Sequence, residues 1–476
     1  MKLYNTLTRQ QDEVKPLLPP AISIYTCGPT VYDYLHIGNW FNYVRMDTLI
    51  RALQANGFTT NWVMNITDVG HLVSDADDGE DKLEKGARRE GKTAWEVAEY
   101  YTADFLEAMQ LLSIQTPDHI VKATDHIAEQ ITLIQRLEAN GYTYVIDDGV
   151  YFDTSKFEGY AAFARLDLEE QQAGARISVN DQKRNQSDFA LWKFSPVDSK
   201  RDMEWDSPFG GDRKGFPGWH IECSAMSMKY LGESFDIHTG GIDHIPVHHT
   251  NEIAQSEAAT GQRFANYWMH SNHVMVNGEK ISKSLGNGIR LQEIIAQGIS
   301  AQATRLNILE SHYRSQSKFS WDGLEAANNR LKHWQQVACL ALQPQSNIPA
   351  SEEQLITAEI AAATTDITAA LFDDLNTPLM LSRLDEAFSI IEKQLLSPPT
   401  AQQFATLLTY IHTVLGIDLL VDIVAPNADD MKLMDRRRAA RQAKEWDISD
   451  KLRYELANAG FGIRDLPSGA TLWFKL

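Results

Sequence analysis

A chain of 476 residues, 43% of them hydrophobic, is long enough for roughly two to four globular domains. Its net charge of −20 argues against a protein that binds nucleic acid over its whole surface. A local basic strip on an acidic protein can still bind phosphate. The three cysteines, Cys27, Cys223 and Cys339, are too few for a disulfide framework and indicate a reducing compartment. The first twenty residues lack the apolar segment of a signal peptide, and no apolar run approaches the length of a membrane span. We therefore expect a cytoplasmic protein without membrane contact.

The first part of the chain predicts a parallel α/β domain. Residues 21–27 alternate apolar and polar side chains and are expected to form a strand. Apolar residues recur at helical spacing in 37–56, and Gly57 follows as a residue suited to the position after a helix. Residues 58–67 predict a second strand. Strand, helix and strand within about fifty residues indicate a βαβ unit and hence a parallel sheet.

The middle of the chain interrupts this pattern. We expect residues 80–112 to be helical, residues around 114–140 to form a charged helix, and residues 143–195 to be rich in β-structure. This block is typical of a domain inserted into the α/β domain. Residues 218–252 then resume the α/β domain, with a short strand at 234–238.

From about residue 290 the pattern is helical. Apolar residues recur at helical spacing in 302–313, 322–342, 354–370 and 377–395. Residues 431–476 are expected to form a separate small unit that begins with a basic helix. Within 431–453, eight basic and four acidic side chains make either a phosphate track or an ordinary solvated helix face.

Residues 218–252 carry a set of possible metal ligands. His248 and Glu252 are four residues apart just after a proline, so a helix opened by that proline places both on one face. Cys223 lies 25 residues before His248, on a predicted preceding helix, and Cys27 is a fourth candidate far upstream. Thiolate, imidazole and carboxylate are all ligands that zinc accepts. Without a CxxC pair, the spacing alone leaves a buried cysteine and surface histidines equally open.

Three short segments have the chemistry of a nucleotide site. HIGN at 36–39 lies between a predicted strand and its helix, where doubly wound sheets bind nucleotides and the helix N-terminus favours phosphate. KISKS at 280–284 suits a mobile clamp on a polyphosphate. GGID at 240–243 offers close backbone approach and a carboxylate for a ribose hydroxyl. The alternatives are a solvated helix cap for the first segment and a solvated basic loop for the second.

Together these segments resemble the HIGH and KMSKS motifs of class I aminoacyl-tRNA synthetases. A closer resemblance, to the cysteinyl-tRNA synthetase family, covers essentially the whole chain. It is carried by TCGPTVYDYLHIGN, NITDV, DFALWK, GWHIECSAMS, HHTNEIAQSEA and KISKSLGN. DDLNTP resembles the family's helical bundle, and AKEWDISDKLR is similar to its anticodon-binding end.

The resemblance implies an α/β fold in which a Rossmann-type parallel-sheet catalytic domain contains an inserted β-containing domain and is followed by a helical bundle and a small C-terminal anticodon-binding domain. The implied boundaries are 1–115 and 215–262 for the two halves of the catalytic domain, 116–214 for the inserted connective domain, 263–325 for the stem-contact region with the KISKS loop, 326–425 for the bundle, and 431–476 for the anticodon-binding domain.

The resemblance also implies the reaction and its residues. ATP activates L-cysteine to an adenylate, and the cysteinyl group passes to the 3′ end of tRNA(Cys). One zinc ion per chain is implied on Cys27, Cys223, His248 and Glu252, with His249 as the alternative imidazole. The implied catalytic residues, acting on ATP with Mg²⁺, are His36, Asn39, Lys280 and Lys283; the implied nucleotide-binding residues are Gly38, Gly240, Gly241, Asp243 and Lys283; and the implied substrate contacts are Thr67 and Trp219.

Zinc has a chemical purpose in such an enzyme. Cysteine and serine differ by one atom, which shape alone discriminates poorly. A zinc ion with an exchangeable position binds a thiolate in strong preference to a neutral hydroxyl, so selection proceeds without an editing domain. For Trp219, ordinary core packing is the alternative to a pocket wall.

The chain departs from the family pattern at a few positions. Asn39 stands where the family's HIGH motif ends in histidine, Ile281 replaces the methionine of KMSKS, and GGIDHIPVHHTNE differs from the commoner LMFPHHENE. The roles of His244 and Thr250 are not predicted. Two other functions stay open: a ligase that joins cysteine to a sugar–inositol amine in mycothiol synthesis, and a non-catalytic tRNA-binding paralogue. We expect a monomer.

Overall fold

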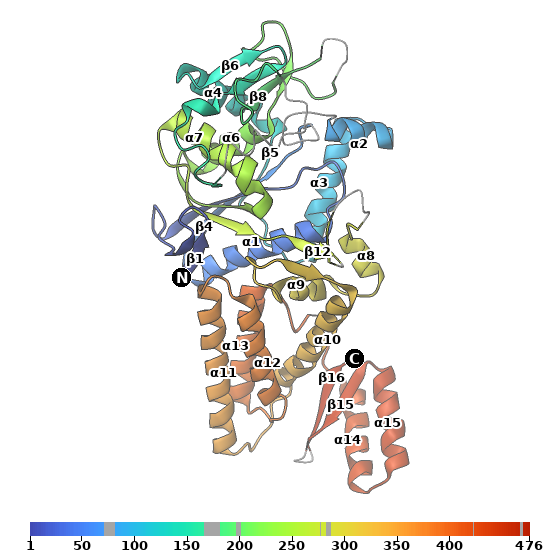
Figure 1. Ribbon diagram of the computed structural model, residues 1–476. Coiled ribbons are helices and arrows are strands. Elements are labelled where there is room, and N and C mark those ends of the chain that lie inside the picture. The colour runs from blue at the N-terminus through green and yellow to red at the C-terminus, as the bar shows by residue number, and fades with distance from the viewer. Residues whose placement is uncertain are drawn as a thin grey trace. The chain divides into compact units, whose positions relative to one another are not determined.

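A computed structural model describes residues 1–70, 81–165, 181–196, 201–276, 278–281, 287–421, 423–466 and 470–476, without the side chains of Lys82 and Lys280. The chain divides into two compact units (Figure 1). The first comprises Met1–Leu291 with Tyr313–Ser317, and the second comprises Gln292–His312 with Lys318–Leu476.

A five-stranded parallel sheet forms the centre of the first unit. Its spatial order is β11 (Ala265–Ser271), β10 (Phe235–Gly241), β3 (Ala21–Thr26), β4 (Thr59–Ile66) and β5 (His119–Lys122). Every neighbouring pair is parallel. Helix α1 (Ile37–Ala55) connects β3 to β4 and confirms the predicted βαβ unit. Because the chain builds the sheet outward in both directions from β3 and β10, the crevice for a ligand lies where these two strands end.

One predicted helix is wrong in its first half. Residues 119–122, placed in a charged helix at 114–140, form β5 at the edge of the parallel sheet, and the helix α4 begins only at Ile127 and ends at Ala139. Pro117 cannot continue a helical ladder, and Asp118 accepts a hydrogen bond from the Trp62 backbone at 2.8 Å. Pairing with β4 thus outweighs local charge pattern.

The helical region predicted at 80–112 consists of two helices, α2 (Lys82–Glu90) and α3 (Ala94–Leu111). The break follows from local chemistry. Gly91 adopts a left-handed conformation with φ 66°, which ends α2. Thr93 and Glu96 then cap the start of α3 reciprocally, since each side chain accepts a hydrogen bond from the other's backbone.

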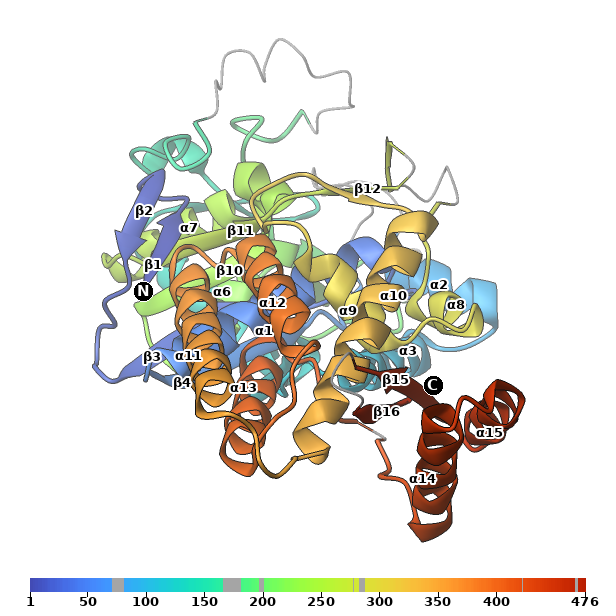
Figure 2. The ribbon, with the colours of Figure 1, turned by 90° about the horizontal axis from the view of Figure 1, so that it is seen from below.

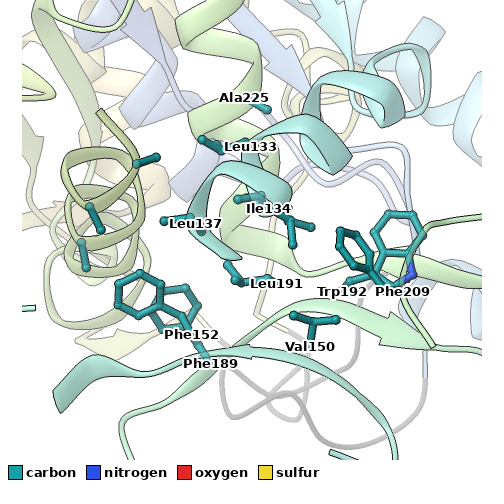
Figure 3. Close-up of a cluster of buried hydrophobic side chains, with 14 of the residues drawn as sticks. Leu133, Ile134, Leu137, Val150, Phe152, Phe189, Leu191, Trp192, Phe209 and Ala225 are labelled. Carbon is teal, nitrogen blue, oxygen red and sulfur yellow. The ribbon is translucent and has the colours of Figure 1, made fainter. Parts of the chain in front are cut away.

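An antiparallel sheet interrupts the α/β domain, as the β-rich pattern predicted. Its order is β6 (Thr143–Ile146), β7 (Gly149–Phe152), β8 (Phe189–Phe194) and β9 (Gly215–Pro217). Its buried side chains pack against α4 and α6 (Trp219–Leu231) in one apolar cluster, within which Leu133, Ile134, Leu137, Val150, Phe152, Phe189, Leu191, Trp192 and Ala225 lie together (Figure 3). The inserted sheet therefore anchors α6, which carries Cys223.

The remaining elements of the first unit are a hairpin and short pieces around the sheet. They are β1 (Lys2–Asn5), β2 (Gln10–Glu13), α7 (Thr250–Thr260), β12 (Val274–Val276) and β13 (Glu279–Lys280). Strand β11 was not predicted; its residues pair with β10 along the outer side of the sheet.

The second unit contains a helical bundle. The segments α9 (Ala301–Leu309), α10 (Trp321–Ala338), α11 (Ala350–Phe372) and α12 (Thr377–Ile391) confirm the four predicted helices, whereas α13 (Pro398–Leu415) was missed. Figure 2 shows α11, α12 and α13 side by side. Helix α11 is long and apolar enough to cross a membrane, although no segment of this kind was expected from the sequence. Its isoleucines at 356, 360 and 367 are buried in the bundle.

The C-terminal segment of this unit pairs α14 (Ala428–Gln442) and α15 (Trp446–Asn458) with the hairpin β15 (Phe461–Asp465) and β16 (Thr471–Lys475). Its core includes Cys339 and Trp473, so packing accounts for the third cysteine. Arg437 belongs to this core as well. Its guanidinium donates two hydrogen bonds of 2.8 Å to the Asp465 carboxylate. The basic strip predicted at 431–453 therefore loses one of its surface charges.

The inserted sheet offers a matched test of its packing. Val145 and Val150 are register partners on β6 and β7, but Val145 is 58% exposed and Val150 only 2%. Val150→Ala removes buried apolar volume and should lower the free energy of unfolding by about 2 kcal/mol. Val145→Ala should change it by less than about 0.5 kcal/mol. Urea unfolding of the full chain measures both, and equal effects would show that this cluster does not stabilise the domain.

Candidate active site and metal centre

A cavity of about 450 Å³ opens at the carboxyl ends of β3 and β10 in the first unit. The side chains and loops around it come from segments far apart in the sequence. Its lining includes Cys27, Thr67, Trp219, Cys223, His248 and Ile281. The cavity thus brings together three of the four predicted metal ligands, the predicted substrate contacts and Ile281 of the KISKS segment, whereas Glu252 is not among its lining residues.

The two cysteines meet because of strand order and helix position. Cys27 directly follows β3, and its backbone nitrogen donates to the Thr239 carbonyl of the neighbouring β10 at 3.3 Å. Cys223 lies on the second turn of α6, which the inserted sheet holds in place. Both thiols are buried, at 4% and 1% exposure.

The imidazole and the carboxylate come from the start of α7. Pro246 lies at the beginning of a wide π-type turn, Ile245–His249, which leads directly into the α-helix. Such turns are rare in proteins, and those that occur are often found at functional sites. The Thr250 hydroxyl donates to the Ile245 carbonyl at 2.7 Å and so closes this turn, which gives Thr250 a structural role. His248 Nε2 lies 3.0 Å from Glu252 Oε1 across the predicted four-residue spacing.

Among the residues that the structure describes, two overlapping groups of four side chains have the composition and closeness of a metal site. The first is Cys27, Cys223, His248 and Glu252, and the second is Cys27, His238, His249 and Glu252. In each group the ligand atoms lie within 4.8 Å of one another, and all the residues are buried. The structure therefore brings the four predicted ligands together and also shows a second combination, built around His249, the alternative imidazole.

The charges of the first group favour a cation at its centre. A hydrogen bond from Cys27 lowers the pKa of Cys223 to about 7, while burial raises the pKa of Cys27 well above its usual value. Burial lowers the pKa of His248, but Glu252 and Cys223 raise it to about 10. Burial raises the pKa of Glu252, but His238 and His248 lower it to about 2. The field that holds a proton on His248 also stabilises a metal ion there.

Further histidines surround this group and hold its members. His220 Nδ1 lies 2.9 Å from His248 Nδ1, and His238 Nε2 lies 2.9 Å from Glu252 Oε2. His249 Nδ1 lies 2.8 Å from His270 Nε2. Sequence reasoning missed His220, His238 and His270, although His220 stands inside a quoted motif and His238 beside one, because a single buried histidine has no spacing signature. A partner on one ring nitrogen fixes the tautomer and directs the other nitrogen to a metal.

The nucleotide side of the cavity is the N-terminus of α1. His36, Gly38 and Asn39 all line the cavity. A Cβ on Gly38 would lie 2.9 Å from Ile281 Cδ1, so only glycine allows this approach without displacement. Asn39 Oδ1 accepts a hydrogen bond from the His36 backbone nitrogen at 3.1 Å. The asparagine that replaces the family's histidine thus caps the helix and leaves its Nδ2 as a donor for the cavity.

The glycine segment after β10 divides between the cavity and its surroundings. Gly241 and Asp243 line the cavity, whereas Gly240 is not among its lining residues and packs against His249 and His244. His244 lines the cavity with its ring centroid 5.2 Å from that of His248. Lys283 and the side chain of Lys280 lie outside the described residues.

The predicted substrate contacts both reach the cavity. The Trp219 ring lies 4.7 Å from the His248 ring between centroids, so this residue is a wall beside the candidate metal site. Thr67 follows β4 and is 2% exposed, and its hydroxyl hydrogen bonds to the side chains of Asn65 and Glu222.

Comparison with known proteins decides the family. The model for the catalytic domain of class I (C) tRNA synthetases matches residues 13–329. A cysteine–tRNA ligase of Treponema denticola is 41% identical over 100% of both chains. Cysteine–tRNA ligase 1 of Burkholderia lata is 44% identical over 99% of this chain and 97% of its own. The chain belongs to the cysteine–tRNA ligase family. A Thermococcus gammatolerans member is 37% identical over 100% of this chain and 99% of its own.

Solved structures of class I synthetases share the fold of this ligase family member. Mycobacterium tuberculosis methionyl-tRNA synthetase bound by methionyl-adenylate matches with a TM-score of 0.56 and 15% identity, over 90% of this chain and 96% of its own. The Agrobacterium radiobacter LeuRS–tRNA–LeuAMS complex matches with a TM-score of 0.60 and 13% identity, over 86% and 85%. At these identities the likeness concerns the fold alone.

The histidine contacts predict how the site holds a metal. His220→Phe keeps an aromatic ring against Phe189 but removes the nitrogen that orients His248. Metal affinity should fall roughly 10- to 100-fold, the usual effect of losing such a partner. Titration with cobalt(II), followed by its visible absorption, measures it. The control His119→Phe changes an exposed ring of the same unit and should leave affinity unchanged; a wild-type affinity in His220→Phe would rule out this role.

Proposed function

We propose that this chain activates L-cysteine with ATP and transfers the cysteinyl group to the terminal ribose of tRNA(Cys), as a monomer in the cytoplasm. Membership in the cysteine–tRNA ligase family supports the reaction. The observation that carries the assignment is the placement of Cys27, Cys223 and His248, with the buried Glu252 beside them, and of the N-terminus of α1 around one cavity. A cysteine thiol and an ATP phosphate can then be bound in the same space, which is the proximity that adenylate formation requires.

The proposal includes one zinc ion on Cys27, Cys223, His248 and Glu252. The donor set fits this metal, because zinc takes four ligands of this kind. Glu252 Oε1 is buried, and its contact with His248 Nε2 lacks hydrogen-bond geometry, so the oxygen has no hydrogen-bond partner among the described residues. When bound, zinc supplies a preference for thiolate sulfur over a neutral hydroxyl.

His248 is a better candidate ligand than His249. Its Nε2 lies 3.0 Å from Glu252 Oε1, against 3.9 Å for His249, and it lines the cavity next to Cys223. His249 Nε2 lies 3.4 Å from Cys27 Sγ and its other nitrogen contacts His270. We therefore assign His249 to orient Cys27 and not to hold the metal.

The proposed ATP site uses the other side of the cavity. His36 and Asn39 at the N-terminus of α1 would donate to phosphate oxygens, where the helix dipole also favours negative charge. Gly38, Gly241 and Asp243 would contact base and ribose, whereas Gly240 does not line the cavity and would only support its neighbour Gly241. Lys280 and Lys283 with Mg²⁺ would neutralise the leaving pyrophosphate.

Two other functions have less support. A cysteine ligase of mycothiol synthesis would share the metal and nucleotide sites but has no use for the basic C-terminal segment of α14 and α15. A non-catalytic tRNA-binding paralogue has no use for the buried ligand set. The proposed domain boundaries follow the sequence expectation, except that β5 within 116–214 belongs to the parallel sheet.

Two assays on the purified chain test the proposal. Cysteine-dependent exchange of pyrophosphate into ATP should occur, and a tRNA with the GCA anticodon should be charged with cysteine. Exchange without charging would favour the mycothiol-type ligase, and binding of tRNA without exchange would favour the non-catalytic paralogue.

If zinc selects the amino acid, a variant that loses zinc should also lose the activation of cysteine. Cys223→Ala should lower zinc content and abolish cysteine-dependent exchange while ATP still binds. Wild type should prefer cysteine over serine by at least roughly 10⁴. Metal analysis and exchange assays with both amino acids measure this. Cys339→Ala, a change of a buried cysteine in the other unit, should leave zinc and exchange intact. Selective activation by zinc-free protein would refute the role.

The basic strip predicts a separable contribution to tRNA charging. Deletion of 431–476 should weaken charging far more than exchange, but it also removes Trp473 from the core around Cys339. A cleaner change reverses two exposed charges, Arg436→Glu with Lys444→Glu.

The double variant should keep wild-type exchange, raise KM for tRNA, and reduce the salt dependence of tRNA binding by about two units of slope. Lys332→Glu, an exposed lysine of α10, is the control. An unchanged salt slope would mean that the strip is only a solvated face.

A further inference from the structure

A buried arginine lies behind the nucleotide side of the cavity. Arg45 follows Gly38 by about two turns of α1, is 3% exposed and does not itself line the cavity. Its guanidinium lies 5.2 Å from the centroid of the Phe41 ring. Burial lowers the pKa of Arg45 to about 9, which still leaves the group charged at neutral pH. Burying such a charge is costly unless neighbouring groups are hydrogen bonded to it.

The Arg45 guanidinium contacts two segments that lie far apart in the sequence. Nη1 donates to Ser271 Oγ at 2.8 Å and to the Asn272 carbonyl at 3.2 Å, at the end of β11. Nη2 donates to Ser317 Oγ. Both segments belong to the first unit. A guanidinium presents five N–H donors in a fixed plane, so this one side chain holds both segments against α1 at the same time.

The first of these segments is a wall of the cavity. Residues 271–274, here called the β11 loop, all line it. The loop is also hydrogen bonded to the second segment: the Asn272 nitrogen donates to the Tyr313 carbonyl at 2.8 Å, and the Ser317 nitrogen donates to the His273 carbonyl at 3.0 Å. Two groups of contacts therefore hold the β11 loop, those from Arg45 and those from Tyr313–Ser317, and Ser317 takes part in both.

Strand register places the β11 loop beside the proposed ATP site. Ser271 is the register partner of Gly241 on β10. Gly241 and Asp243 line the cavity and are the proposed contacts for base and ribose, whereas the phosphates are assigned to the N-terminus of α1. ATP bound in this way lies between α1 and the β11 loop. The separation of these two walls therefore sets how well the nucleotide fits.

We propose that Arg45 is a positioning residue for ATP, because it ties the β11 loop and the Tyr313–Ser317 segment to α1 and so fixes the width of the nucleotide side of the cavity. This role of Arg45 rests on the proposed function. When the contacts of Arg45 are lost, part of the free energy of ATP binding goes into ordering the loop, and the affinity for ATP falls. Cysteine, whose thiol is assigned to the metal side of the cavity, keeps its affinity.

The test measures the binding of ATP and of L-cysteine, separately, to the purified full chain. Arg45→Met keeps an unbranched side chain but removes every N–H donor. The dissociation constant for ATP should rise roughly 10- to 100-fold, the usual effect of losing hydrogen bonds to a charged group, while that for cysteine stays unchanged. Arg45→Lys retains the charge, but one ammonium nitrogen cannot span both segments, so ATP binding should stay weak. Wild-type ATP affinity in either variant would overturn the role of Arg45.

Arg51→Met is the matched control. Arg51 is a second buried arginine of α1, but it donates to Asp47 Oδ2 and to the Ser113 carbonyl, both at 2.7 Å, and none of these residues lines the cavity. This variant should lower the free energy of unfolding and leave ATP affinity unchanged. Equal weakening of ATP binding by Arg51→Met and Arg45→Met, or equal weakening of ATP and cysteine by Arg45→Met, would mean a general loss of structure and would also overturn the role.

A milder variant covers the case in which Arg45→Met does not fold. Ser317 is 2% exposed and does not line the cavity, so we expect Ser317→Ala to act on ATP through Arg45. The dissociation constant for ATP should rise roughly threefold or more, and in an Arg45→Met background the change should cost no further affinity. Wild-type ATP affinity in Ser317→Ala, or additive losses in the double variant, would contradict the proposal. A failure of the proposed function appears instead in wild type, as absence of cysteine-dependent exchange.

Discussion

The adjacency of β3 and β10 in the parallel sheet is the constraint on which the site depends. The two strands are separated by more than two hundred residues of chain, yet their register pairs Thr26 with Thr239. Parallel strands end at the same edge, so Cys27 emerges beside the segment that leads to His248 and Glu252. Without this pairing the four candidate ligands would have no common centre.

Burial is what gives this centre its chemistry. Two thiols, an imidazole and a carboxylate gathered away from water cannot all keep their ordinary charge states, and the pKa values of Cys27, Cys223, His248 and Glu252 move accordingly. Each of the surrounding histidines contacts a different residue of the site. His220 and His238 hold members of the ligand set in place, and His270 holds His249. Hydrogen bonds among these groups offset part of the cost of burying them.

The inserted sheet contributes to the site at a distance. Its side chains pack on α6, and α6 carries both Cys223, a candidate ligand, and Glu222, which accepts the hydrogen bond of Thr67. One helix therefore links the position of an apolar core to a candidate metal ligand and to the cavity that Thr67 lines. In the second unit, Arg437 also differs from what composition alone indicates. It was counted as a surface charge of the basic strip, but it is buried and forms an ion pair with the Asp465 carboxylate.

The sequence by itself determined the family, the βαβ unit around α1, the β-rich insertion, most of the bundle helices and the candidate ligands, because these depend on local periodicity and on motifs of fixed spacing. The tertiary structure decided what local pattern cannot express. Residues 119–122 became a strand through pairing with β4, against a charge pattern that suggested a helix. His248 and His249 are neighbours in sequence and equal in chemistry, and only the positions of His220, His270 and Cys27 distinguish them. The hydrogen bonds that join Thr67 to Asn65 and Glu222 likewise exist only after β4 and α6 have met, since folding decides which groups come within reach of one another.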